Sequence, residues 1–262
     1  MMYLFGGYIG LLGMLLFLEN RLIYHPSPVS VPAPTSDIQD IDLASADGTR
    51  IHAWWYPAKE SKDVLLYCHG NAGNLSHRGP TIIKLSKILN TSVLIFDYPG
   101  YGKSEGKVSE KGCFDAADAA YQWLTETQKA PSERILLFGA SLGGGVATDL
   151  AARKDHRALV LVKTFTSLPD VASDLYWWLP APTRLLMSNQ MNSLAKIKNV
   201  QRPVFIAHGT KDNLIPFSHG KRLFDAANAP KHFYEMDGAG HNDGLSEEFF
   251  NAVKEFLRVN SN

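Results

Sequence analysis

Cysteine is scarce in this chain, which has only Cys68 and Cys113 among its 262 residues. Cys68 ends an apolar run and Cys113 begins a helical one, so both are predicted to be buried thiols outside any disulfide framework. Net charge is also absent, because 26 basic residues balance 26 acidic ones. No basic stripe with interleaved aromatic residues occurs, and we therefore expect no nucleic-acid partner.

Metal-binding patterns are missing as well. The nine histidines form no His-Glu-x-x-His motif and no paired cysteine and histidine spacing. We therefore expect neither a metal nor a cofactor. Internal repeats and low-complexity tracts are absent too, and the length suits one large α/β domain.

The first eighteen residues lack any charged side chain. As a helix they would span about 27 Å, close to the hydrocarbon core of a bilayer. No lysine or arginine precedes this run, and Glu19, Asn20 and Arg21 follow it, which does not fit a cleaved signal peptide. The sequence predicts a single-pass transmembrane anchor at 1–18, in contact with membrane lipid, and a Pro-rich linker at 19–37. The membrane side of the remaining chain and the oligomeric state stay open.

Residues 38–262 have the pattern of one α/β domain. A hairpin comes first, followed by short aliphatic runs that alternate with helical segments, an order that predicts a mostly parallel eight-stranded sheet with helices on both faces. The predicted strands are Ile38–Leu43, Arg50–Tyr56, Val64–Tyr67, Val93–Phe96, Ile135–Phe138, Leu159–Val162, Val204–Ala207 and His232–Met236. The predicted helices are Arg78–Leu89, Cys113–Thr127, Leu142–Ala152, Ser218–Ala227 and Glu247–Val259.

One irregular interval, 164–199, is rich in large apolar residues, including Trp177, Trp178 and Leu179. It is predicted to form a small cap. Three roles are open for it: lining an acyl pocket, resting on a membrane surface, or simple packing over the sheet.

A Gly-x-Ser-x-Gly pattern joins the strand Ile135–Phe138 to the following helix, with Gly139, Ser141 and Gly143 at its fixed positions. Glycine relieves crowding around a strained strand-to-helix turn, which presents the serine hydroxyl at the edge of the sheet. Ser141 is therefore a candidate nucleophile, although an ordinary turn serine is the alternative.

A serine hydroxyl needs a base, and the base needs an orienting carboxylate. Asp212 lies just beyond the strand Val204–Ala207, and His241 lies just beyond the strand His232–Met236. The order serine, aspartate, histidine differs from that of the chymotrypsin and subtilisin folds. We therefore assign Ser141, Asp212 and His241 as the candidate triad, with Asp237 and Asp243 as competing carboxylates.

Two amide donors should face the oxyanion of such a reaction. The loop after Val64–Tyr67 makes the backbone N–H of Asn71 one candidate, and the N–H of Leu142 is the other. His69 is expected to shape this loop, and the segment 97–104 is expected to be turn structure.

Three segments resemble the α/β-hydrolase superfamily: HGNAGNLSHR at 69–78, FDYPGYGKSEG at 96–106 and GASLGGGVA at 139–147. Within it they are similar to the membrane-anchored Bem-type branch, which is related to eukaryotic protein depalmitoylases. The resemblance runs from the apolar start to the final helix, and it implies the triad and oxyanion residues named above. Lys163 and Thr164 depart from the pattern, because relatives often carry an acidic residue there.

These observations predict a cofactor-independent serine hydrolase of carboxylic esters or thioesters, of the EC 3.1 type, whose substrate carries an apolar acyl group. A serine peptidase of aminopeptidase type is an alternative, and it would need acids such as Asp170 and Asp174 to hold a free amino terminus. A non-catalytic, membrane-tethered binding protein is another alternative. The physiological substrate and its acyl length are not determined by the sequence.

Overall fold

The structure is a computed structural model that describes residues 2–59, 61–178 and 182–260. Met1, the first residue of the predicted anchor, and Leu179, in the predicted cap, lie outside the described residues.

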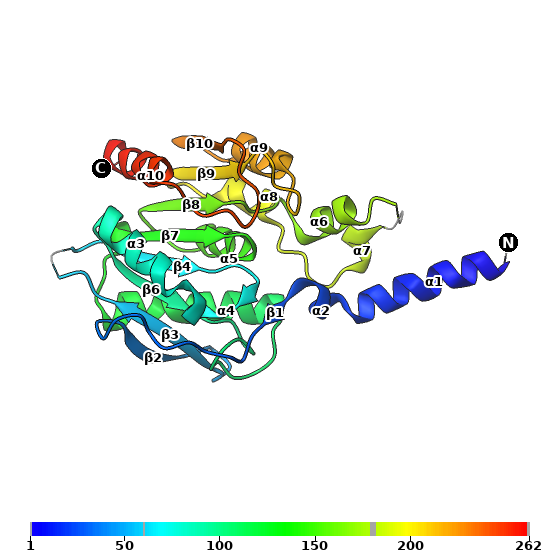
Figure 1. Ribbon diagram of the computed structural model, residues 1–262, viewed down its shortest axis with the longest axis horizontal. Coiled ribbons are helices and arrows are strands. Elements are labelled where there is room, and N and C mark those ends of the chain that lie inside the picture. Colours follow the sequence, from blue (N-terminus) through cyan, green and yellow to red (C-terminus); the bar gives the residue numbers. More distant parts are fainter. Residues whose placement is uncertain (1, 60, 179–181, 261–262) are drawn as a thin grey trace.

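Eight strands form one sheet in the order β10-β9-β8-β7-β4-β6-β3-β2, which runs from the top to the bottom of Figure 1. Their bounds are β2 Gln39–Ala44, β3 Arg50–Tyr56, β4 Val64–Cys68, β6 Ser92–Phe96, β7 Ile135–Ala140, β8 Ala158–Val162, β9 Val204–Gly209 and β10 Lys231–Met236. Strand β3 is antiparallel to β2 and β6, and the other neighbours are parallel. The predicted α/β fold with a mostly parallel eight-stranded sheet is confirmed.

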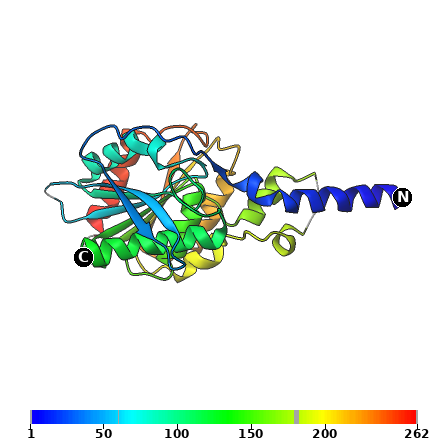
Figure 2. The ribbon, with the colours of Figure 1, turned by 90° about the horizontal axis from the view of Figure 1, so that it is seen from below.

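Helices cover both faces of this sheet (Figure 2). On one face lie α3 (Gly79–Leu89) and α10 (Glu247–Val259), and on the other lie α4 (Glu110–Gln122), α5 (Leu142–Ala151) and α9 (Phe217–Ala226). Short elements complete the body: η1 Leu75–Arg78, η2 Trp123–Thr127, η3 Ser132–Arg134, α8 Ser193–Lys196 and η4 Ile197–Asn199.

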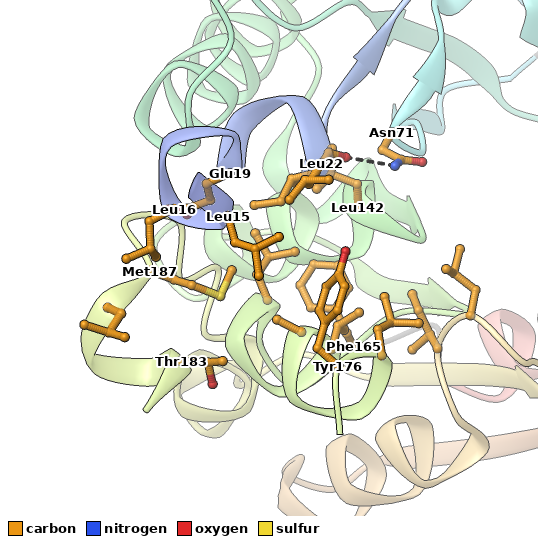
Figure 3. Close-up of a pocket in the computed structure, with 18 of the residues that line it drawn as sticks. Leu15, Leu16, Glu19, Leu22, Asn71, Leu142, Phe165, Tyr176, Thr183 and Met187 are labelled. Atoms are coloured by element: carbon orange, nitrogen blue, oxygen red, sulfur yellow. Dashed lines mark hydrogen bonds between the residues drawn. The ribbon is translucent and has the colours of Figure 1, made fainter. Parts of the chain in front are cut away.

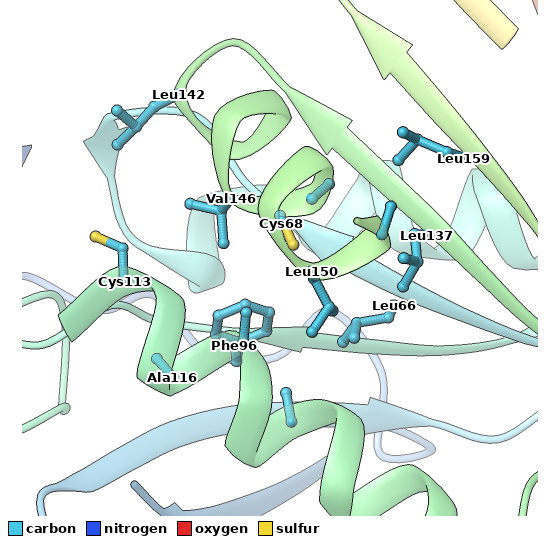
Figure 4. Close-up of a cluster of buried hydrophobic side chains, with 14 of the residues drawn as sticks. Leu66, Cys68, Phe96, Cys113, Ala116, Leu137, Leu142, Val146, Leu150 and Leu159 are labelled. Carbon is cyan, nitrogen blue, oxygen red and sulfur yellow. The ribbon is translucent and has the colours of Figure 1, made fainter. Parts of the chain in front are cut away.

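Successive side chains of β4 point to opposite faces of the sheet, and so they pack under two different layers of helices. Leu65 and Tyr67 pack in the cluster under α3 and α10, whereas Leu66 and Cys68 pack in the cluster under α4 and α5 (Figure 4). A strand that is apolar on both faces is buried on both faces, as parallel strands commonly are. Cys68 and Cys113 are both free and buried here, as predicted.

Helix α4 begins three residues before the predicted Cys113. Ser109 caps it, because its Oγ accepts a hydrogen bond from the N–H of Gly112 at 3.1 Å. The polar first turn carries no apolar periodicity, and so the hydrophobic pattern alone placed the start too late.

The Pro-rich segment after residue 18 lies against the body. Strand β1 (His25–Pro26) pairs in parallel with β5 (Ala72–Gly73), a two-stranded sheet that the sequence did not predict. The amide of Asn74 then donates to the carbonyls of Ser27 and Val29 at 2.9 and 2.8 Å. The N-terminal segment is thus fixed to the loop that follows β4.

The N-terminal helices α1 (Met2–Phe17) and α2 (Glu19–Ile23) lie next to the cap, which contains α6 (Leu168–Leu175) and α7 (Thr183–Leu186). Figure 1 shows α1 projecting from the same end of the body as α6 and α7. Within the described part of the chain, no helix combines the length and the apolar character needed to cross a membrane.

Candidate active site

Ser141 occupies a strained turn between β7 and α5. Its φ of 52° and ψ of −120° place a non-glycine residue in an unfavourable backbone region. A Cβ at Gly143 would overlap the carbonyl oxygen of Cys68, and one at Gly139 would meet the carbonyl oxygen of Gly143. Glycine is therefore required on both sides of the turn that presents this serine.

The structure brings Ser141, His241 and Asp212 into one chain of hydrogen bonds. Nε2 of His241 lies 3.0 Å from Oγ of Ser141, and Nδ1 of His241 lies 2.7 Å from Oδ2 of Asp212. Both partners follow the carboxyl ends of strands, Asp212 after β9 and His241 after β10. With Nδ1 as the donor to Asp212, Nε2 is left to accept the proton of the serine hydroxyl.

The competing carboxylates have other partners. Asp243 accepts the N–H of Gly240 at 2.8 Å, and Asp237 accepts the hydroxyl of Thr210 at 3.3 Å. Asp212 is thus the carboxylate that the fold aims at the imidazole of His241.

The carboxyl of Asp212 is buried and well supplied with donors. Burial raises its pKa, but hydrogen bonds from His208, His241 and the N–H of Ile215 outweigh that effect and hold the pKa below its ordinary value. Asp212 is therefore ionised at neutral pH, the state in which it can orient the imidazole and stabilise its cation.

Lys163 and Thr164, the two positions that depart from the resembled pattern, both contact the backbone of the site. The ammonium of Lys163 donates to the carbonyl oxygens of His241 and Asp243, at 3.2 and 2.7 Å. The hydroxyl of Thr164 donates to the carbonyl oxygen of Ser141 at 2.8 Å. The sequence carries no signal for these roles of Lys163 and Thr164, because the contacts join loops far apart in the chain.

Asn71 and Leu142, the predicted oxyanion residues, line the same pocket as Ser141. Leu142 is the first residue of α5, so its N–H has no acceptor within the helix. The side-chain amide of Asn71 donates to the carbonyl oxygen of Ile23 at 2.9 Å, which ties this loop to α2. His69 does not line the pocket. Its Nδ1 lies 2.7 Å from the carbonyl oxygen of Gly70, and the hydroxyl of Tyr98 donates to the carbonyl oxygen of His69.

A large apolar pocket opens beside Ser141. The space within it and at its mouth, part of which is open to solvent, amounts to about 1120 Å³, and Figure 3 shows 18 of the residues that line it. Its walls come from the N-terminal helices, from the cap and from the loops around the reaction centre. The lining residues are Leu12, Leu15, Leu16, Glu19, Leu22, Ile23, Asn71, Ser141, Leu142, Phe165, Leu168, Val171, Ala172, Leu175, Tyr176, Thr183, Leu186, Met187, Leu214 and Ile215.

The N-terminal part of this lining was missed from the sequence. In a helix that is apolar on every side, the pocket-facing leucines are not distinguishable from the others by hydropathy. The predicted role of the cap in lining a pocket beside Ser141, by contrast, agrees with the positions of Phe165, Leu168 and Tyr176.

A mostly parallel sheet with a serine on a strained strand-to-helix turn, followed by an aspartate and a histidine after later strands, defines the class of α/β hydrolases. A family model for the alpha/beta hydrolase fold matches residues 63–182. The chain is 38% identical over 239 residues to the uncharacterized protein Rv2307c of Mycobacterium tuberculosis, covering 88% of this chain and 84% of that protein. It is 34% identical over 198 residues to alpha/beta hydrolase domain-containing protein 17B of Xenopus laevis, covering 75% of this chain and 67% of that protein.

Among solved structures, an esterase of Pyrococcus furiosus, Pf2001, superposes with a TM-score of 0.76 at 22% identity, covering 92% of this chain and 98% of the esterase. This likeness concerns the fold. The protein described here belongs to the alpha/beta hydrolase family, and that membership supports a hydrolase activity.

Proposed function

We propose that this protein is a serine hydrolase that cleaves carboxylic esters or thioesters bearing an apolar acyl chain, and that it belongs to the membrane-anchored Bem-type branch. The observation that carries the proposal is that the candidate nucleophile and an apolar pocket adjoin each other. The hydroxyl of Ser141, hydrogen-bonded to His241, opens directly into a pocket lined mainly by aliphatic side chains. An apolar pocket beside a nucleophile binds an apolar acyl group and exposes its carbonyl to attack.

The proposed reaction has two halves. Oγ of Ser141 attacks the acyl carbon while its proton passes to Nε2 of His241, and the N–H groups of Leu142 and Asn71 stabilise the oxyanion. The bond to the alcohol or thiol then breaks, and His241 returns the proton to this leaving group. Water hydrolyses the acyl-enzyme by the same steps, with His241 again acting first as base and then as acid. Asp212 remains ionised throughout.

The first test is hydrolysis of p-nitrophenyl esters from acetyl to palmitoyl, with matching acyl thioesters in parallel. Ser141→Ala is expected to lower kcat by roughly 10⁴-fold or more. Ser132→Ala is the matched control, because the half-buried Ser132 lies just before the same strand β7, at the end opposite to Ser141. Absence of turnover of every ester by the wild-type protein would contradict the proposal.

Peptide hydrolysis has less support. An aminopeptidase needs free carboxylates near the nucleophile, but Asp170 is paired with Arg184 and Arg222, and Asp174 with His219. Neither aspartate lines the pocket. Turnover of aminoacyl naphthylamides above that of esters would favour the peptidase instead.

Covalent labelling distinguishes a non-catalytic binding protein from either kind of serine hydrolase. A fluorophosphonate probe reacts with a serine that an adjacent base activates. The wild-type protein is expected to be labelled, and the Ser141→Ala variant is expected to remain unlabelled. An unlabelled wild-type protein would favour the binding role.

We also propose that this end of the molecule contacts membrane lipid. Phe17 on α1, Trp177 after α6 and Leu185 on α7 are 87%, 80% and 86% exposed, which is unusual for such large apolar side chains. All three belong to the end from which α1 projects (Figure 1). Apolar side chains that include tryptophan suit the interfacial region of a bilayer.

Flotation with phosphatidylcholine vesicles tests this contact. The triple substitution of Phe17, Trp177 and Leu185 by serine is expected to reduce the bound fraction severalfold. Val259→Ser is the control, because Val259 is also exposed but lies on α10 at the opposite end. Equal flotation of the triple variant and the wild type would refute lipid contact through this surface.

A further inference from the structure

The pocket-facing residues of the N-terminal helices follow a regular helical spacing. They are Leu12, Leu15, Leu16, Glu19, Leu22 and Ile23, which we call the pocket-facing stripe. Offsets of three and four residues place side chains on one face of a helix. The intervening Met14 and Phe17 are exposed instead. One defined face of α1 and α2 is therefore turned to the reaction centre.

Buried polar contacts hold this face in place. The carboxylate of Glu19 accepts the N–H groups of Ser188 and Asn189 at 3.0 and 2.6 Å, and also the side-chain amide of Asn189 at 2.8 Å. The hydroxyl of Tyr24 donates to Oδ1 of Asn189 at 2.7 Å. Because Asn189 belongs to the cap interval 164–199, these bonds fix the N-terminal helices and the cap relative to each other.

The stripe also has a direction. Ile23 lies at its inner end, since its carbonyl oxygen accepts from the amide of Asn71 in the candidate oxyanion loop. Chain positions before Ile23 lead outward along α2 and α1, away from the body (Figure 1). Leu22, Leu15 and Leu12 thus lie at increasing distance along the chain from the end that touches the reaction centre.

The opposite wall comes from the cap. In Figure 3, Leu15, Leu16 and Leu22 approach the cavity from the N-terminal helices, while Phe165 and Tyr176 approach it from the other side. A chain bound at Ser141 would therefore run outward between α1 and the cap. Neither wall alone encloses it.

We propose that the N-terminal helices form the wall of the acyl site that determines which chain lengths are accepted. This inference rests on the proposed function, because it assigns the pocket to the acyl group. One turn of helix, about 5.4 Å, corresponds to roughly four methylene groups of an extended chain. Each position of the stripe therefore matches a different segment of the acyl chain, and the residues at the start of this protein are part of its substrate site.

The test compares two neighbouring residues on opposite sides of α1. Leu15→Trp fills the pocket and is expected to lower kcat/KM for palmitoyl esters by roughly 10-fold or more, because several methylene groups lose their burial. Hydrolysis of acetyl esters is expected to fall much less than that of palmitoyl esters, because a short chain does not reach this position. Met14→Trp, which changes the exposed side, is expected to leave the whole chain-length profile unchanged.

Two further substitutions test the direction of the stripe. Leu12→Trp is expected to affect only the longest esters, whereas Leu22→Trp is expected to affect medium chains as well. Leu15→Ala, which adds space without overpacking, is expected to move the preference toward longer chains. Identical profiles for Leu15→Trp, Leu15→Ala and Met14→Trp would overturn the inference.

A binding measurement separates this inference from the proposed function. In the Ser141→Ala background, fatty acids from butanoate to hexadecanoate displace cis-parinaric acid without any turnover. When Leu15→Trp is added to this background, the affinity for hexadecanoate is expected to fall by roughly 10-fold and the affinity for butanoate to change far less. If the wild-type protein hydrolyses no ester but this shift occurs, the proposed function fails and the role of the wall stands. If esters are hydrolysed but Leu15→Trp shifts neither the hydrolysis profile nor the binding profile, the proposed function stands and the role of the wall fails.

Discussion

The ammonium of Lys163 lies 3.2 Å from the carbonyl oxygen of His241, although 78 residues separate them. The same ammonium donates to the carbonyl of Asp243 at 2.7 Å. Lys163 thus holds the backbone of the loop that carries the candidate base, without touching the imidazole itself. Burial lowers its pKa, and nearby Asp243 and Asp212 act in the opposite direction.

Replacing Lys163 by methionine is expected to lower kcat for ester hydrolysis by roughly 10- to 100-fold, because small displacements of a catalytic group are costly. KM for the same ester is expected to change little, since Lys163 does not line the pocket. Steady-state kinetics with p-nitrophenyl butyrate measures both constants.

Lys84→Met provides the control for Lys163→Met. Its ammonium also donates to a backbone carbonyl of this region, that of Leu245 at 3.2 Å, but not to that of His241. A similar loss of kcat in both variants would mean that general loosening of the loop, not the position of His241, is responsible.

Gly143→Ala is expected to destabilise the fold, because the new Cβ would overlap the carbonyl groups of Cys68 and His69. Both are backbone atoms, which cannot move aside as a flexible side chain does. We expect a loss of about 2–3 kcal/mol in the free energy of unfolding, measured with urea. Gly145→Ala, on the same helix, meets the side chains of Phe165 and Met191 at 3.1–3.3 Å and is expected to cost less. Equal costs would contradict this explanation.

The sequence was sufficient for the parts of the fold that local patterns encode. Short apolar runs predicted the inner strands β4, β6, β7, β8 and β9, because a strand buried on both faces is continuously apolar. The glycines around Ser141 predicted its turn, and strand ends predicted the loops of Asp212 and His241. Each of these inferences needs only neighbours in the chain.

Contacts between distant segments were beyond sequence reasoning. The bonds of Glu19 to Ser188 and Asn189 join residues about 170 positions apart, and no periodicity reports them. Glu19 follows the apolar run directly, and no local pattern indicates that its carboxylate is buried and accepts hydrogen bonds from Ser188 and Asn189. The pocket-facing side of α1 was hidden for the same reason.

Protonation of His156 is expected to reduce stability as the solution becomes acidic. Burial lowers its pKa, although a hydrogen bond to the carbonyl of Lys154 at 2.9 Å acts the other way. In the unfolded chain the pKa is about 6.5. Below that pH the unfolded state binds the proton first, so the contribution of His156 is complete above about pH 6.5 and is lost as the pH falls.

Urea unfolding between pH 5 and 8, roughly the range in which histidine titrates, measures this effect. His156→Gln is expected to flatten the decline of the unfolding free energy below about pH 6.5 relative to the wild type. Other groups that titrate in this range are common to both proteins and cancel in the comparison. Parallel curves for the two proteins would show that His156 does not contribute.

Removal of the Glu19 carboxylate is expected to loosen the N-terminal wall of the pocket. Glu19→Ala leaves the N–H groups of Ser188 and of the buried Asn189 without their acceptor, at an expected cost of roughly 2 kcal/mol in the free energy of unfolding. Glu19→Gln keeps one acceptor oxygen and is expected to cost less. Because Ser141 does not contact Glu19, we expect KM for palmitoyl esters to rise in Glu19→Ala while acetyl esters are hydrolysed as before. A uniform loss of activity across all chain lengths would instead indicate that Glu19 supports the whole site and not the distal wall alone.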